Sequence, residues 1–168
     1  PAYDGLTVAD VSVAITDNDV PPPVRIADIQ GASHISPKAG EGVLGVPGIV
    51  TALASNGFYL QDPQPDADPE TSDAIFVFTN AAPTVAIGDA VRVSGTVTEF
   101  RPGGTATNLT VTEIVNNNAV QPLSVTAWTD VPAGSSVAPL VLGVDRVAPT
   151  ANYNDEGTVN VETGGSFD

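Results

Sequence analysis

The stretch that decides the fold is Ala90–Phe100, with the sequence AVRVSGTVTEF. Valines alternate in it with Arg, Ser and Thr, so an extended strand would have one apolar and one polar face. Gly95 interrupts this alternation, and a glycine inside a strand predicts a bulge or the tight bend of a small barrel. The sequence therefore predicts one long, curved β-strand at the centre of the fold.

Further strand patterns lie on both sides of it, rich in Val, Ile, Thr and Phe and bounded by turn residues. Together with residues 90–100, runs at residues 48–54, 57–61, 74–79 and 109–115 make five strands, and a strand-like run at 123–127 follows them. Five consecutive antiparallel strands with one long member predict an all-β protein, a five-stranded OB-like Greek-key barrel with flanking β-strand tails. An immunoglobulin-like sandwich is the alternative, but it needs about seven comparable strands.

The chain divides into a compact unit and two tails. The barrel is expected over residues 24–147, after a Pro linker at 21–23 and before a linker at 148–168. Residues 138–144 are apolar and are expected to close the core as a short helix or strand. Residues 1–20 are too short for a domain, and no Met is present, so we expect the chain to be a piece of a longer protein.

Composition excludes several classes of function. The chain has 168 residues and no Cys, which excludes disulfide scaffolds, thiolate metal sites and Cys nucleophiles. The single His, His34, excludes a multi-His metal site. The net charge is −15 with five Lys and Arg, so the chain lacks a basic stripe and its field repels polyanions. Such acidity is typical of a secreted protein in a calcium-containing medium, or it serves solubility alone.

Several segments, taken in order, resemble one family. These segments are residues 29–37, 48–52, 57–62, 66–73, 75–78 and 85–100. They are similar to the OB-fold-like accessory module of bacterial extracellular nucleases of the endonuclease/exonuclease/phosphatase superfamily. Residues 141–150 and 161–168 resemble the segment that leads to the nuclease domain, and residues 1–20 resemble the C-terminal strands of a Calx-beta domain. The resemblance implies a non-catalytic accessory or scaffold module of a secreted bacterial protein, whose partners are neighbouring domains of the same polypeptide.

A loop after the second of these strands concentrates negative charge. Its five carboxylates belong to Asp62, Asp66, Asp68, Glu70 and Asp73. Like charges this close repel one another, and calcium, which takes six to eight oxygen ligands, would relieve the repulsion. The alternative is a solvated turn in which Asp and Pro serve turn chemistry. Asp17 and Asp19 resemble calcium ligands at the end of a Calx-beta domain, although the partner loops are missing.

Aromatic residues lie on two adjacent predicted strands. Phe76 and Phe78 share one face by alternation, whereas Phe58 opposes Tyr59. Exposed aromatics on this face of an OB-fold stack nucleic-acid bases. Phe58, Tyr59 and Arg92 are therefore candidates for weak binding of single-stranded nucleic acid, and the alternative is that the aromatics belong to the core.

Three other hypotheses remain. His34 lacks a G-x-S-x-G elbow nearby, so a role in loop structure is favoured over catalysis. A metal-dependent phosphodiesterase built on Asp62, Asp66, Asp68 and Asp73 is the least favoured function. Residues 6–15 (LTVADVSVAI) alternate as a strand with unpaired edges, so they could add to another copy by β-augmentation and build a homo-oligomeric fibre. No apolar run is long enough to insert into a membrane.

Overall fold

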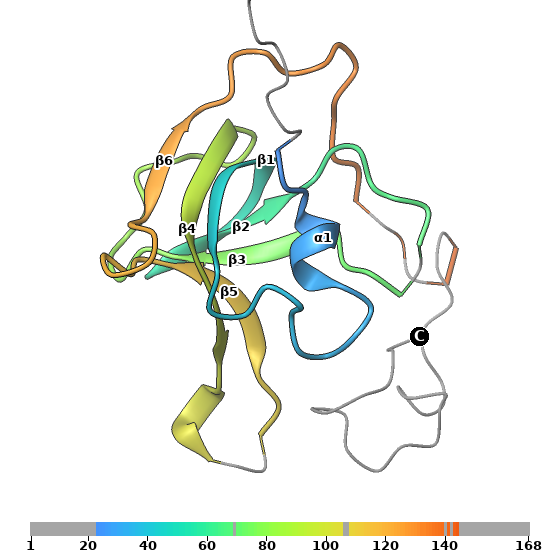
Figure 1. Cartoon of the computed structure of the whole chain (residues 1–168). Helices are drawn as coiled ribbons and strands as arrows, with labels where there is room; N and C mark the ends of the chain where they lie inside the picture. Colours follow the sequence, from blue (N-terminus) through green and yellow to red (C-terminus); the bar gives the residue numbers. More distant parts are fainter. Residues whose placement is uncertain (1–22, 69, 106–107, 140, 142, 145–168) are drawn as a thin grey trace, which may run out of the picture.

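One short helix and six strands make up the computed structural model, which describes residues 23–68, 70–105, 108–139, 141, 143 and 144 (Figure 1). The elements are α1 Ile26–Gln30, β1 Gly42–Ala54, β2 Gly57–Gln61, β3 Ala74–Phe78, β4 Ala90–Phe100, the 3-10 turn η1 Pro102–Gly104, β5 Val111–Val115 and β6 Ser124–Ala127. The bounds predicted for β2 and β4 are confirmed. β1 begins well before the predicted residue 48, because the Gly- and Pro-containing segment ahead of it is also part of the strand.

The sheet closes on itself as an OB-like barrel. Its strand order is β1-β2-β3-β5-β4, and a pairing between β1 and β4 completes the ring, with β6 added along β4. β3 and β5 are parallel, whereas the other pairs are antiparallel. The expectation of antiparallel strands throughout is therefore wrong at one pair. After β3 the chain crosses the barrel, and β4 pairs with β1. The β4–β5 hairpin then brings β5 back beside β3, and the two strands run in the same direction.

β4 joins the two halves of this ring. It pairs with β1 along residues 90–96 and with β5 along residues 96–100. The register shift lies on β1 between Val43 and Val46, so the bulge belongs to the partner strand and not to Gly95 itself. A Cβ at Gly95 would lie 2.5 Å from Ile114 Cγ2 and 2.9 Å from the Val115 carbonyl oxygen. Gly95 is needed because β5 approaches the backbone of β4 closely at this point.

The core inside the barrel is almost entirely aliphatic. Val, Ile and Leu side chains fill it, and Phe58 is its only aromatic member among the described residues. Ile26 and Ile29 of α1 are fully buried in the same cluster, and α1 packs beside β3 (Figure 1). α1 was not predicted, because five residues are too few to show a helical period.

The segment after β6 does not close the core. Its described residues form neither helix nor strand, and the side chains of Val141 and Val144 are 53% and 80% exposed. The prediction for residues 138–144 is therefore wrong at these positions, since α1 already supplies apolar cover for the barrel. None of the described helices has both the length and the apolar character needed to cross a membrane. Residues 6–15, Asp17 and Asp19 lie outside the described residues.

Candidate functional site

The outer surface of the barrel carries aromatic side chains that the core does not use. Because Leu60, Ile75 and Val77 point inward, their neighbours along β2 and β3 point outward. Four of the six aromatic residues that the structure describes lie on this outer side of β2, β3 and β4, and we call them the aromatic face: Tyr59, Phe76, Phe78 and Phe100. Tyr59 and Phe100 are about half exposed.

Tyr59 and Phe76 form the best-defined part of the aromatic face. They are direct partners across β2 and β3, with ring centroids 5.0 Å apart and ring planes at 54°. Next in the same row is Glu113 of β5, which pairs with Phe76 and, on its other side, with Thr98 of β4. Only 6% of Glu113 is exposed, and this burial raises the pKa of its carboxyl.

A groove of about 450 Å³ opens beside Tyr59 and Phe76. Its walls come from the loop after α1, from the loop at residues 62–73, which we call the acidic loop, and from the start of β5. The polar groups on these walls belong to Gln30, Ser33, His34, Glu70, Ser72 and Thr110. Among the described residues that line it, Glu70 is the only acidic side chain, and there is no Lys or Arg. The groove thus combines an aromatic floor, neutral hydrogen-bonding groups and one carboxylate, the mixture typical of a ligand site.

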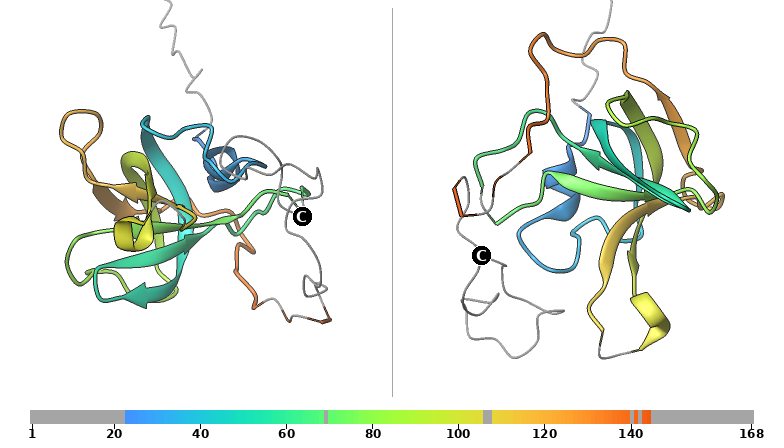
Figure 2. Two further views of the ribbon diagram at one scale, coloured as in Figure 1. Left: turned by 90° about the horizontal axis from the view of Figure 1, so that it is seen from below. Right: turned by 180° about the vertical axis from the view of Figure 1, so that it is seen from behind.

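His34 joins two of these walls. Its Nε2 accepts a hydrogen bond from the backbone N–H of Thr110 at 3.2 Å and lies 3.0 Å from Thr110 Oγ1. Because Nε2 accepts from an N–H group, the ring proton of a neutral His34 sits on Nδ1. This contact fixes the loop after α1 against the β4–β5 hairpin, which extends away from the barrel (Figure 2).

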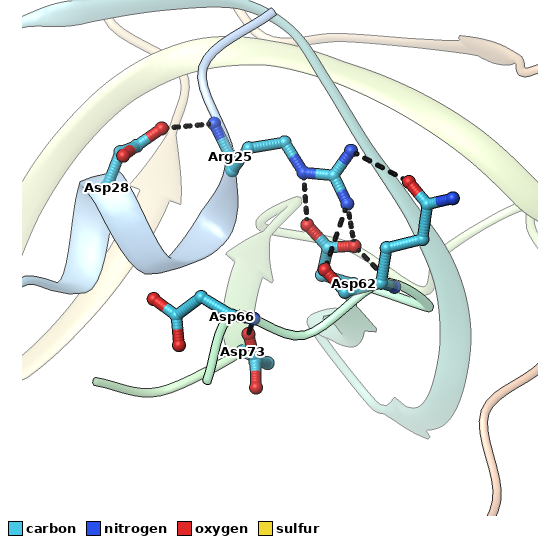
Figure 3. A network of polar contacts seen from close by, with 6 residues as sticks. Arg25, Asp28, Asp62, Asp66 and Asp73 are labelled. Atoms are coloured by element: carbon cyan, nitrogen blue, oxygen red, sulfur yellow. Dashed lines mark hydrogen bonds and ion pairs between the residues drawn. The ribbon is translucent and has the colours of Figure 1, made fainter. Parts of the chain in front are cut away.

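Asp62, the first carboxylate of the acidic loop, is occupied by an ion pair. It is 2% exposed, and Arg25 donates to its two oxygens through Nε, at 2.6 Å, and Nη2 (Figure 3). The backbone N–H of Gln64 adds a third hydrogen bond at 2.8 Å. Arg25 also precedes α1, where its own N–H donates to Asp28. The pair therefore ties the start of α1 to the loop after β2.

The other carboxylates of the loop accept hydrogen bonds from the loop itself. Asp66 accepts from the Asp68 N–H at 3.0 Å and from the Thr71 hydroxyl at 2.9 Å, and Asp68 accepts from the Glu70 N–H at 3.0 Å. Asp73 accepts from the Asp66 N–H at 3.3 Å. The bonds from the Asp68 and Glu70 N–H groups, each to the Asp two residues earlier, are those of Asx turns. Within the described part of the chain, no three His, Asp or Glu side chains form a group that could hold a metal.

The five carboxylates thus do not converge on one point, and calcium binding by this loop stays a prediction. Burial raises the pKa of the Asp73 carboxyl, and the charges of Asp66 and Asp62 raise it further. The hydrogen bond from the Asp66 backbone and the charge of Arg25 oppose this shift. Negative charge is therefore still concentrated at the loop after Arg25 has paired with Asp62.

The three residues predicted to bind nucleic acid do not form one surface. Phe58 is 1% exposed because it points inward with Leu60, so it offers no face to a base, and its assignment is corrected. Tyr59 lies on the aromatic face. Arg92 lies opposite Pro47 of β1, whereas Tyr59 lies opposite Ala52. Five residues of extended strand separate these two points, a distance of roughly 16 Å.

Arg92 contacts two residues that follow β6, Trp128 and Asp130. Its Nη2 donates to the Asp130 carboxylate at 3.0 Å, and its guanidinium carbon lies 5.5 Å from the centroid of the Trp128 ring. The hydrogen bond from Arg92 lowers the pKa of Asp130. This arrangement places one cation between an aromatic ring and a carboxylate, a combination with a favourable cation–π contribution.

Phe100 and Glu113 were not predicted from the sequence to be parts of this surface. The signal for Glu113 is its position next to Ile114, which is fully buried, so that Glu113 points outward. Nothing in the sequence indicated that Ser33 and Thr110 line the groove, because these two residues come together only in the folded barrel. Comparison of the chain with protein-family models, with curated proteins and with solved structures gives no match.

Proposed function

We propose that the chain is a non-catalytic accessory module of a larger secreted protein, and that the aromatic face with its groove is its binding surface. The observation that carries this proposal is the placement of Tyr59, Phe76, Phe78 and Phe100 outside an aliphatic core. Apolar side chains that gather on one outer face of a soluble domain mark interaction sites, and the rings of Tyr59 and Phe76 lie against each other on this face. OB-like barrels bind extended ligands across strands 2 and 3, where Tyr59 and Phe76 lie.

The non-catalytic part of the proposal is supported by the side chains that a phosphodiesterase would need. Asp62 would have to turn its oxygens to a metal shared with Asp66, Asp68 and Asp73, but those oxygens face Arg25. His34 is held by Thr110 through Nε2. Incubation of the chain with DNA and Mg²⁺ or Mn²⁺ tests this directly: we expect intact DNA, and cleavage that depends on the added metal would overturn it.

The sequence resemblance supports attachment to a bacterial extracellular nuclease. The aromatic residues of the strands and the acidic loop support weak binding of a single nucleic-acid strand with help from calcium. Tyr59 supports the stacking that such binding needs. No cationic side chain near Tyr59 supports neutralisation of the phosphates in the same way. Arg92 lies far from Tyr59, and the groove is lined by the carboxylate of Glu70, which repels phosphate. Calcium would have to supply the positive charge.

Fluorescence anisotropy with labelled oligo-dT and a labelled peptide of alternating Arg and Leu, each with and without calcium, tests the binding surface. Tyr59→Ala removes the exposed ring, and Leu44→Ala is the matched control, since Leu44 is 65% exposed on β1 and lies outside the groove. We expect at least one probe to bind and Tyr59→Ala to weaken its binding, by about 1–3 kcal/mol where the probe is oligo-dT. Equal effects of the two variants, or no binding of either probe, would contradict the proposal.

A second candidate is assembly by strand addition. β6 pairs with β4 along one edge, and within the described residues no strand pairs with its other edge. Its sequence, SVTA, contains none of the charges or prolines that protect open edges. We propose residues 6–15 of another copy as the strand that would pair there. Light scattering should then show large particles that disappear when residues 1–20 are deleted, and a monomeric full chain would overturn this candidate.

A further inference from the structure

The ladder between β3 and β5 is short. Phe76 pairs with Glu113 and Val77 pairs with Ile114, whereas the preceding residues of the two strands do not pair with each other. β3 and β5 meet at their C-terminal ends and diverge toward their N-terminal ends, and the loop after α1 lies at the opening (Figure 1 and Figure 2). The first residues of both strands line the groove, so the groove lies at the unpaired part of the ladder.

The main chain of β5 points into this opening. Val97 of β4 exchanges main-chain hydrogen bonds with the residues just ahead of β1, on the side of β4 away from β5. Since main-chain groups alternate between the two sides of a strand, Val97 and its partner Ile114 form a non-hydrogen-bonded pair. By the same alternation, the N–H and C=O groups of Thr110 and Thr112 point away from β4 and toward β3.

Ala74 would occupy the next position of the ladder if the ladder continued, because it lies two residues before Phe76. Instead, the Ala74 carbonyl oxygen accepts a hydrogen bond from Gln30 Nε2 at 2.7 Å, and its N–H donates to Ser72 Oγ at 3.3 Å. The main chain of β3 is therefore satisfied by side chains at the point where β3 leaves β5.

β5 thus has one strand position that β3 does not fill. It lies beside Val111, between the C=O group of Thr110 and the N–H group of Thr112, and no described residue of β3 pairs there. The N–H of Thr110 is used differently, since it donates to His34 Nε2. A residue of an added parallel strand would donate to the Thr110 carbonyl oxygen and accept from the Thr112 N–H, which continues the ladder by one residue.

The side chain of such a residue would lie on the same outer side of the barrel as the aromatic face. Phe76 and Val111 both point to this side and both line the groove, and Val111 is 45% exposed. An apolar side chain suits this place. The net charge of −15, with no Lys or Arg among the described lining residues, favours a neutral or basic segment over an acidic one.

We infer that the groove binds an extended segment of a partner polypeptide, one residue of which pairs with β5 beside Val111 in the parallel direction. This inference rests on the proposed binding surface and names its ligand class. A polypeptide carries main-chain N–H and C=O groups at the spacing of a strand, so it can continue the ladder. Nucleic acids and glycans carry no such repeat.

Peptides of alternating Arg and Leu, followed by fluorescence anisotropy, test whether the main chain is recognised. In an extended peptide the amides of Leu and of Arg point to opposite edges, so N-methylation of every Leu blocks one edge and N-methylation of every Arg blocks the other. With Leu beside Val111, N-methyl-Leu should weaken binding by about 2–12-fold, the loss of one hydrogen bond, and N-methyl-Arg should have little effect. Equal affinities of the two modified peptides would overturn the inference.

Amide exchange shows where the added strand lies. The Thr112 N–H should exchange more slowly when the peptide is bound, because it gains an acceptor. Ala127 of β6 is the control: the Trp128 N–H donates to the Ala90 carbonyl oxygen at 2.9 Å, so the Ala127 N–H points to the open edge of β6. Slower exchange at Ala127 with no change at Thr112 would place the peptide on β6 and overturn the inference.

Matched variants test the contact with the ligand side chain. Val111→Ala and Leu44→Ala each shorten an exposed apolar side chain on a strand, but only Val111 lines the groove. We expect Val111→Ala to weaken the Arg/Leu peptide by about 4-fold, the equivalent of roughly one buried CH₂ group, and Leu44→Ala to have little effect. Equal weakening by the two variants would contradict the inference.

The outcomes distinguish this inference from the proposed function. If peptide binding falls with Tyr59→Ala but does not respond to N-methylation, the pairing with β5 is wrong while the binding surface stands. The same holds if oligo-dT binds in a Tyr59-dependent way and the peptide does not bind. A peptide affinity that rises when residues 1–20 are deleted would show that the chain's own segment competes, and would overturn the assignment to a partner. If no probe binds, the inference and the binding surface are both wrong.

Discussion

The guanidinium of Arg25 donates to both oxygens of the buried Asp62 carboxylate, 37 residues away in the sequence. The pair joins the residue before α1 to the loop after β2 (Figure 3). Both segments lead into walls of the groove. A buried carboxylate needs such a partner, because its desolvation is otherwise uncompensated. The shape of the candidate binding surface therefore depends on an ion pair outside it.

Arg25→Met should destabilise the protein strongly, because it leaves the Asp62 charge buried and unpaired. Arg25 is about a third exposed, so we expect the lower end of the known range, about 3 kcal/mol. Urea unfolding of the single variant and of the Arg25→Met/Asp62→Leu double variant measures this loss. The double variant should recover most of the stability, and a single variant as stable as the wild type would contradict the account.

Gly95→Ala tests the close approach of β5 to β4. Its new Cβ would meet Ile114 Cγ2 at 2.5 Å and the Val115 carbonyl oxygen at 2.9 Å, and backbone atoms cannot move away cheaply. We expect the free energy of unfolding to fall by about 1–3 kcal/mol. Ser124→Ala, on the exposed strand β6, is the control and should have little effect. Similar stabilities for the two variants would refute the close packing.

The Glu113 carboxyl gives the protein a specific pH dependence. Burial raises its pKa in the folded state, so folding favours the protonated form, and its contribution to stability is lost as pH rises through the folded pKa. Glu113→Gln should therefore be more stable than the wild type at neutral pH, with a gain that disappears as pH falls below the unfolded pKa of about 4.3. Unfolding free energies measured across this pH range, with Glu41→Gln as the exposed control, test it. A gain that grows toward low pH would contradict the assigned direction.

Replacing His34 should loosen the wall of the groove without unfolding the barrel. His34→Ala removes the acceptor of the Thr110 N–H, a hydrogen bond worth about 0.5–1.5 kcal/mol. Amide exchange at Thr110 should therefore become about 2–12-fold faster, while exchange at Val93, inside β4, stays unchanged. Equal acceleration at both amides would show that His34 supports the whole fold and not this contact.

The strands were largely predictable, because a period of two in Val, Ile and Thr marks them directly. β4 and β2 were predicted with their observed bounds. The first part of β1 was not, because Gly45 and Pro47 are residues that usually punctuate strands, and here they lie at and beside a bulge. α1 was not predicted, because only Ile26 and Ile29 mark its buried face.

The site was predictable only in part. Alternation in β2 separates Phe58 from Tyr59 but does not say which of them faces inward, and that choice is made by closure of the barrel. The acidic loop was predicted as a group of carboxylates, but its Asp62 is neutralised by Arg25, a partner that no local pattern indicates. The groove walls from Ser33 and Thr110 depend on tertiary placement in the same way.

The most direct test of the binding surface is an NMR titration of the whole chain with the alternating Arg/Leu peptide, following backbone amide shifts. We predict that the largest changes cluster at Tyr59, Phe76 and Thr110, which line the groove, while Arg92 and the amides of β6 change little. Changes centred on β6, or spread evenly over the acidic surface with no maximum at the aromatic face, would contradict the account.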